Sequence, residues 1–209
     1  MLDALMDGSA RPAGELARRA GIASSTASSH LSRLHAGGLV SYEAHGRERL
    51  YRLAPGEIAE ILEALARLAP PAQTRSLQSA NRDNAMRFAR TCYDHLAGYC
   101  GVTITESLVD RGALLPRDTA YELTASGEVL MARLGVDVAA ARTRHRAFAR
   151  ACLDWSERRS HLAGALGAAL ADTLISRGWL IRRPNDRALT VTPDGAAALH
   201  RHLGIELAR

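Results

Sequence analysis

Apolar residues recur at helical spacing in two short blocks between residues 12 and 40. Pro12 can begin a helix, because a first-turn residue has no partner for an N–H. Gly21 allows a sharp turn, and Ser24 or Ser25 can cap the helix that follows. The apolar faces are formed by Leu16, Ala17 and Ala20 in the first block and by Ala27, Leu31 and Leu34 in the second. This pattern predicts two short helices with a tight turn between them.

The polar positions of the second predicted helix are small or basic. Hydroxyl, imidazole and guanidinium groups can meet base edges and phosphates in the major groove of DNA. We therefore predict that this face reads DNA. Its residues are Ser24, Ser25, Thr26, Ser28, Ser29, His30 and Arg33.

Two strands are predicted after this helix, which ends at Gly37-Gly38. Residues 39–43 and 47–53 flank His45-Gly46, and this arrangement is typical of the wing in a winged helix-turn-helix. Arg47 and Arg49 lie near the tip, where a planar guanidinium can bind backbone phosphate.

The stretch TASSHLSRLHAGGLV, followed by GRERLYRL, resembles the recognition helix and wing of ArsR/SmtB-type winged-helix repressors. The resemblance covers roughly residues 1–69. It implies a homodimer that binds a palindromic double-stranded DNA operator and represses transcription until an effector releases it. Winged helices also serve as protein-interaction modules without specific DNA binding. The polar front of the second helix favours DNA.

An apolar stripe is predicted on a helix over residues 57–68. The resemblance implies that a partner subunit covers this stripe, and packing within the same domain is the alternative. Residues 70–82 open with two prolines and lack periodicity, which indicates a linker. We expect a DNA-binding domain at 1–55, a dimerisation helix and linker at 56–82, and an effector domain at 83–209. The stripe consists of Ile58, Ile61, Leu62, Leu65 and Leu68.

The second half of the chain contains an internal duplication. Phe-Ala-Arg-x-Cys-x-Asp begins at Phe88 and again at Phe148, and His-Leu-Ala-Gly-x-x-Gly begins at His95 and again at His161. Matching Arg-Gly and Thr-x-x-Gly motifs follow in both copies, at about 83–137 and 143–206. Each copy is predicted to contain a helix, a second helix ending at Arg-Gly, an extended segment and a closing helix. The fold class is therefore mainly α with small β-wings, in two lobes that share a pocket-forming boundary.

Sensor residues are expected at this boundary. If the copies are related by a pseudo-twofold, Cys92 and Cys152 lie on equivalent helices near the boundary. His95 and Tyr99 share the predicted helical stripe of Cys92. The corresponding candidates in the second copy are Cys152, Trp155 and His161.

Three interpretations of these residues stay open: inert core cysteines, a thiol or soft-metal sensor using Cys92, His95, Cys152 and His161, or contact with a small apolar effector. Two ligand placements known from the resembled family are absent, because residues 12–20 contain no Cys and residues 57–68 contain neither His nor Cys. No other cofactor is predicted. The repeated pairs Arg90/Asp94 and Arg150/Asp154 are expected to be surface pairs on helices.

Composition adds support without changing this interpretation. A formal charge of +5 and a pI near 9.6 agree with a polyanionic partner. Three cysteines without a close pair do not form a secretory disulfide framework, and no apolar run is long enough to span a bilayer. We expect a cytoplasmic protein without membrane association. No catalytic or phosphate-binding motif indicates an enzyme.

Overall fold

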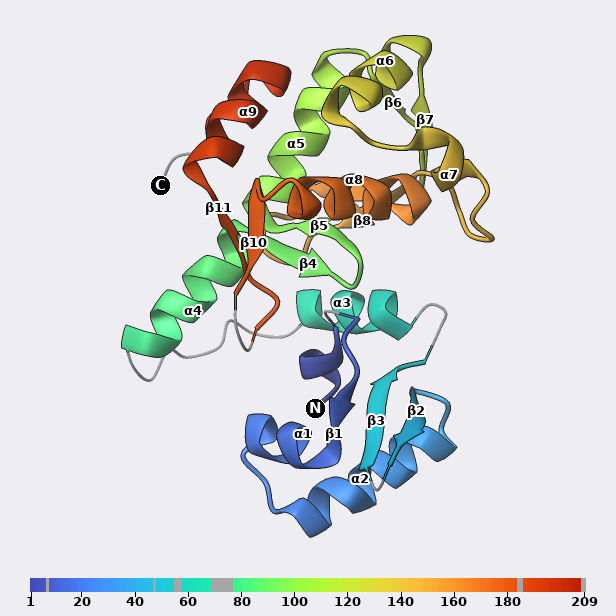
Figure 1. The fold of residues 1–209 in the computed structure, drawn as a ribbon, viewed down its shortest axis with the longest axis vertical. Helices are drawn as coiled ribbons and strands as arrows, with labels where there is room; N and C mark the ends of the chain where they lie inside the picture. Colours follow the sequence, from blue (N-terminus) through green and yellow to red (C-terminus); the bar gives the residue numbers. More distant parts are fainter. Residues whose placement is uncertain (7, 47, 55–57, 69–76, 184–185, 208–209) are drawn as a thin grey trace. The chain divides into compact units, whose positions relative to one another are not determined.

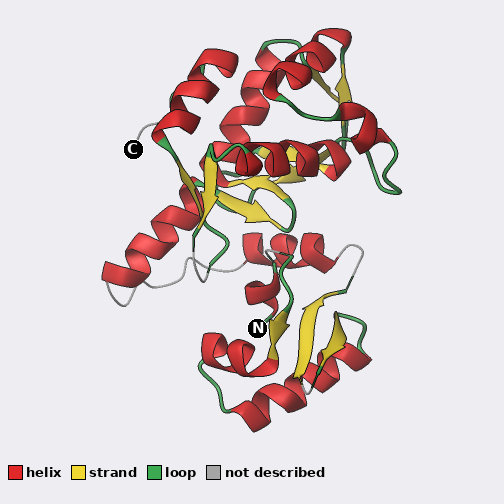
Figure 2. Ribbon diagram, viewed as in Figure 1, coloured by secondary structure: helices red, strands yellow, loops and turns green. Residues whose placement is uncertain are grey.

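The computed structural model describes all residues except 7, 47, 55–57, 69–76, 184–185 and 208–209. The chain divides into two compact units, Met1–Leu65 and Ala66–Arg209. Helices predominate in both, and the strands are short (Figure 2).

The first unit is a winged helix-turn-helix (Figure 1). Leu16 and Leu31 are fully buried on the facing helices α1 and α2, as their helical spacing predicts. Gly21 ends α1 at φ 66° in the left-handed region, so the predicted turn is confirmed. A three-stranded antiparallel sheet, in the order β1-β3-β2, completes the unit. The elements are η1 (Leu2–Leu5), β1 (Arg11–Pro12), α1 (Ala13–Ala20), α2 (Ser24–Ala36), β2 (Val40–His45) and β3 (Glu48–Leu53), and helix α3 (Ile58–Leu68) begins in this unit and continues past its end at Leu65.

The second unit begins with helix α4 (Leu77–Phe88). Residues 77–82, predicted as linker, are therefore helical, whereas 70–76 lie outside the described residues. The order hairpin, helix, hairpin, helix then occurs twice. The first block contains β4 (Arg90–Cys92), β5 (His95–Ala97), α5 (Gly98–Asp110), β6 (Leu114–Pro116), β7 (Tyr121–Leu123) and α6 (Ala125–Leu134). After α7 (Val138–Arg142), the second block contains β8 (Arg150–Leu153), β9 (Ser160–Ala163), α8 (Gly164–Ser176), β10 (Leu180–Arg182), β11 (Leu189–Val191) and α9 (Pro193–Leu203).

The two blocks share backbone hydrogen bonds in a reciprocal way. The amide of Thr91 donates to the Arg187 carbonyl at 3.0 Å, and the amide of Ala151 donates to the Thr119 carbonyl at 2.9 Å. Each block therefore pairs its first hairpin with the second hairpin of the other block. The helices α5 and α8 pack around these hairpins, and residues of both blocks form one apolar core.

The helix predicted around Cys92, His95 and Tyr99 is wrong. Cys92 lies in β4, His95 in β5 and Tyr99 in α5, so the three do not share a helical stripe. The corresponding helix around Cys152 and Trp155 is also absent, because Cys152 lies in β8. Cys92 and His95 are three residues apart because they face each other across the turn of a hairpin, and this separation is also the one found on a helix face.

Gly98, the first residue of α5, follows the β4–β5 hairpin and has little space around it. This residue has φ 75°, and a Cβ placed on it would lie 2.6 Å from the carbonyl oxygen of Arg87. The left-handed conformation favours glycine, and the close backbone approach leaves no room for a side chain. The predicted helix is interrupted earlier, at the turn between β4 and β5, where Tyr93 has φ 60° and Cys92 pairs with His95.

Candidate functional site

The polar face of α2 is fully available for contact. Ala27 and Leu31 are buried on the opposite face. The predicted DNA-reading side chains on this helix are all exposed, namely Ser24, Ser25, Thr26, Ser28, Ser29, His30 and Arg33.

One local expectation for α2 is wrong. Neither Ser24 nor Ser25 caps the helix, because Ala23 occupies the N-cap position and no side chain caps it. The Ser28 hydroxyl donates to the Ser24 carbonyl at 3.0 Å, a common alternative for serine within a helix. The first turn of α2 therefore presents uncapped N–H groups beside serine hydroxyls, which suits a phosphate.

The wing is the β2–β3 hairpin, with Tyr42 paired to Tyr51. Arg49 is exposed, and its guanidinium lies over the Tyr42 ring at 4.7 Å from the centroid. This stacking orders the guanidinium on the wing. Arg47, predicted to act beside it, lies outside the described residues.

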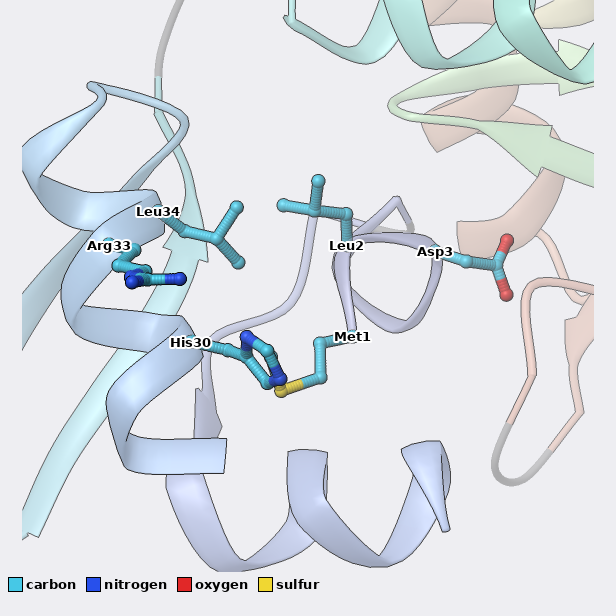
Figure 3. A pocket seen from close by; sticks show the side chains of 6 residues that line it. All are labelled: Met1, Leu2, Asp3, His30, Arg33 and Leu34. Carbon is cyan, nitrogen blue, oxygen red and sulfur yellow. The ribbon is translucent and has the colours of Figure 1, made fainter. Parts of the chain in front are cut away.

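A hollow of about 490 Å³ lies between η1 and α2 (Figure 3). His30 points toward Met1, and Leu34 faces Leu2, whereas the carboxylate of Asp3 points away from α2. Arg33 also lines the hollow.

The second unit contains a buried cluster of two cysteines and two histidines. The four ligand atoms of Cys92, His95, Cys152 and His161 all lie within 4.8 Å of one another, and all four residues are buried. Nε2 of His95 lies 3.2 Å from Nε2 of His161. Each hairpin contributes one cross-strand pair: Cys92 faces His95, and Cys152 faces His161.

Each histidine of the cluster has a carboxylate at its other ring nitrogen. Nδ1 of His161 lies 3.1 Å from Oδ2 of Asp154, and Nδ1 of His95 lies 3.3 Å from Oδ1 of Asp94. Asp94 also pairs with Arg146. Each carboxylate therefore holds its histidine ring by Nδ1, which leaves Nε2 on the side where the two cysteines lie.

Asp154 is held by a dense set of donors. Arg90 binds both of its carboxylate oxygens, at 3.0 and 2.9 Å, and the Gly98 amide donates to Oδ2 at 2.7 Å. Ser156 donates to Oδ1 from both its amide and its hydroxyl. Arg90 and Asp154 are completely buried. The expected surface pairs Arg90/Asp94 and Arg150/Asp154 are thus wrong, because Arg90 binds Asp154 of the other block instead.

The environment favours charge separation within the cluster. The hydrogen bond with Cys92 lowers the pKa of the Cys152 thiol far below its usual range, and His161 and His95 lower it further, against the effect of burial. Burial alone would lower the pKa of His161, but Asp154 and Cys152 raise it above the ordinary value. Burial also opposes ionisation of Asp154, yet His161 and Arg90 hold the pKa of this carboxyl well below its usual range.

Other predicted sensor residues lie differently. Tyr99 is 37% exposed and stacks on Phe88, with the ring centroids 6.0 Å apart. Trp155 lies under the guanidinium of Arg90, 4.6 Å from the ring centroid, so it packs behind the Arg90–Asp154 pair. Cys100 is buried in the apolar core, where burial raises the pKa of its thiol to about 12.

Comparison with known proteins agrees with the winged helix. The family model described as "Bacterial regulatory protein, arsR family" matches residues 1–42, which include both helices of the helix-turn-helix. The HTH-type transcriptional regulator YdfF of Bacillus subtilis (strain 168) is 45% identical over 207 residues, which are 99% of this chain and 92% of that protein. The chain belongs to the arsR family. As an arsR-family protein it is a DNA-binding transcriptional regulator and not an enzyme.

The similarity to this relative extends well beyond the helix-turn-helix, so it includes the second unit of the arsR-family chain. No solved structure matches the chain. Among the described residues, no helix combines the length and apolarity needed to cross a membrane.

Proposed function

We propose that the protein is a homodimeric repressor that binds a palindromic double-stranded DNA operator and leaves it when the second unit receives a signal. The observation that carries the DNA-binding role is the face of α2, where the predicted base-reading side chains lie at the surface and the apolar residues Ala27 and Leu31 are buried beneath. Arg49 on the wing supplies contact with backbone phosphate.

The exposure of α3 supports the homodimer. Ala59 is buried on one side of this helix, whereas Ile61, Leu65 and Leu68 are 51%, 56% and 82% exposed. An apolar stripe of this kind is stabilised when a second subunit covers it. A dimer with two recognition helices also accounts for a two-half-site operator.

The second unit is proposed to be an internal duplication that receives the signal. Its two blocks repeat the same elements, and the Thr91–Arg187 and Ala151–Thr119 hydrogen bonds are equivalent under exchange of the blocks. The Cys-His cluster lies where the two blocks meet. A ligand bound there would contact both blocks at once, which is how a signal can change their arrangement.

Duplex binding as a function of salt tests this proposal. A specific repressor binds DNA from its own promoter region far more tightly than a scrambled duplex, by about 10³-fold or more, and both affinities fall with salt. Fluorescence anisotropy with the two duplexes measures this ratio. Equal, salt-insensitive binding to both would assign the winged helix to protein interaction instead.

A further inference from the structure

We propose that Cys92, His95, Cys152 and His161 bind one ion of the Zn²⁺ class in a closed tetrahedral site between the two blocks of the second unit. The site rests on the geometry of this unit alone. Its use as the regulatory signal rests in addition on the function proposed above.

The distances between the ligand atoms fit such an ion. With Zn–N bonds of about 2.05 Å and Zn–S bonds of about 2.3 Å, the edges of a tetrahedron measure about 3.4 Å between nitrogens and about 3.8 Å between sulfurs. The Nε2 atoms of His95 and His161 lie 3.2 Å apart, close to the first value. The most distant ligand atoms are within 4.8 Å, so they need to approach by about 1.3 Å at most.

The residues behind the ligands have the arrangement expected around a metal. In protein zinc sites the ring nitrogen that does not bind the metal usually donates to a carboxylate, a backbone carbonyl or a water molecule, which fixes the tautomer and the orientation of the ring. Asp154 has this position beside His161, and Asp94 has it beside His95. A carboxylate at Nδ1 favours a proton on that nitrogen, so Nε2 is the nitrogen that can give up its proton to bind an ion.

The charges balance when a divalent ion is present. Two thiolates neutralise the ion, and both imidazoles bind in their neutral form. Arg90 neutralises Asp154, and Arg146 neutralises Asp94. The occupied site therefore carries no net charge. This matters because burying ionisable groups costs much less free energy when their charges are paired.

The donor set also determines the class of ion. Two thiolates and two imidazoles favour Zn²⁺, Co²⁺ and other borderline or soft ions, whereas Mg²⁺ and Ca²⁺ require oxygen ligands. Four protein ligands leave no open position, which is typical of structural rather than catalytic zinc sites. Because Cys92 and His95 belong to one block and Cys152 and His161 to the other, the ion joins the blocks.

Metal analysis of the full-length chain, purified under reducing conditions, tests the proposal. We expect one Zn²⁺ per chain. After chelation, addition of Co²⁺ should give the visible absorption of a tetrahedral site together with thiolate-to-cobalt charge transfer. Bound Zn²⁺ should protect Cys92 and Cys152 from alkylation, which peptide mapping detects.

Substitutions identify the ligands. Cys92→Ser and Cys152→Ser should abolish stoichiometric binding, and Asp154→Asn should weaken it roughly 10- to 100-fold. Cys100→Ser is the matched control, since Cys100 is equally buried but outside the cluster, and it should bind normally. Circular dichroism of each variant verifies its fold. If a Ser variant does not fold, the Co²⁺ spectrum of the wild-type chain still decides the matter.

Three results would overturn the metal site: no Zn²⁺ or Co²⁺ binding by the folded wild-type chain, a cobalt spectrum without thiolate bands, or Cys152→Ser binding as tightly as the wild type. If the purified chain instead contained a Cys92–Cys152 disulfide and no metal, the two cysteines would be a redox pair and not metal ligands. Duplex affinity is measured on the same samples. Absence of metal binding with intact operator binding would refute the site and leave the repressor proposal standing.

Discussion

The Arg90 guanidinium forms two hydrogen bonds with the Asp154 carboxylate, at 3.0 and 2.9 Å, and both side chains are completely buried. The two residues belong to different blocks of the second unit. Their pairing brings the β4–β5 hairpin next to the loop that follows β8. The same carboxylate contacts His161 of the Cys-His cluster.

Removal of the Arg90 charge should destabilise the protein strongly. Arg90→Met leaves Asp154 buried without its cation, and breaking a buried ion pair in this way costs about 3–5 kcal/mol. Denaturant unfolding of the metal-free chain measures the change in the free energy of unfolding. The control is Arg117→Met, because Arg117 pairs with Glu122 at the surface and both are more than half exposed. That change should have almost no effect, and an equal destabilisation in both variants would refute the structural role of the buried pair.

The elements of the first unit could be predicted from the sequence because they depend on local patterns. A few neighbouring residues determine each of these elements. Examples are the apolar faces around Leu16 in α1 and Leu31 in α2, the turn at Gly21 and the strands of the wing. The cap of α2 was assigned wrongly, since a serine at the first helical position and one at the cap look the same in the sequence.

The Cys-His cluster was predicted in part. Repetition of the Cys and His motifs identified Cys92, His95, Cys152 and His161 as candidates near a shared boundary. Their secondary structure was wrong, because residues on two strands of a hairpin also occurred at helical spacing. The partners Asp154 and Arg90 were missed as a pair, since they are 64 residues apart in the chain and a nearer partner was available in the sequence.

Gly167 should be essential for packing α8 against the cluster. A Cβ at this position would lie 2.4 Å from the Leu162 carbonyl oxygen and 3.3 Å from Cβ of His95. Gly167→Ala must therefore displace β9 or β5, at a cost of about 1–3 kcal/mol, and should weaken metal binding by moving His95. Gly14→Ala in α1 is the control. Its Cβ meets only the end of Arg18 at 3.9 Å, so alanine should stabilise the helix by about 0.5–1 kcal/mol. Thermal unfolding of both variants, with opposite shifts expected, checks this.

The α2 face and the wing should contribute differently to DNA binding. Ser28, Ser29 and His30 face base edges in the proposed complex, whereas Arg49 contacts phosphate. Arg49→Ala should weaken binding to all duplexes alike. It should also make the affinity less sensitive to salt: the slope of log affinity against log salt concentration should become shallower by about 0.9 for each phosphate that Arg49 neutralises in the wild type. His30→Ala should change the preference among operator variants. Affinities measured over a salt series with matched and mismatched operators distinguish these outcomes, and a change of preference in Arg49→Ala would reverse the assignment of roles.

The exposed stripe on α3 should hold the dimer together. Ile61 and Leu65 are 51% and 56% exposed, so a charge at either position is tolerated by the isolated chain but not by an apolar interface. Leu65→Glu should give a folded monomer by light scattering, and it should bind a single half-site weakly without holding the full operator. Val129→Glu is the matched control, because Val129 is 55% exposed on α6, a helix of the second unit that does not belong to the stripe. This variant should remain dimeric. A wild-type chain that is monomeric at micromolar concentration, or a Leu65→Glu variant that still dimerises, would show that another surface joins the subunits.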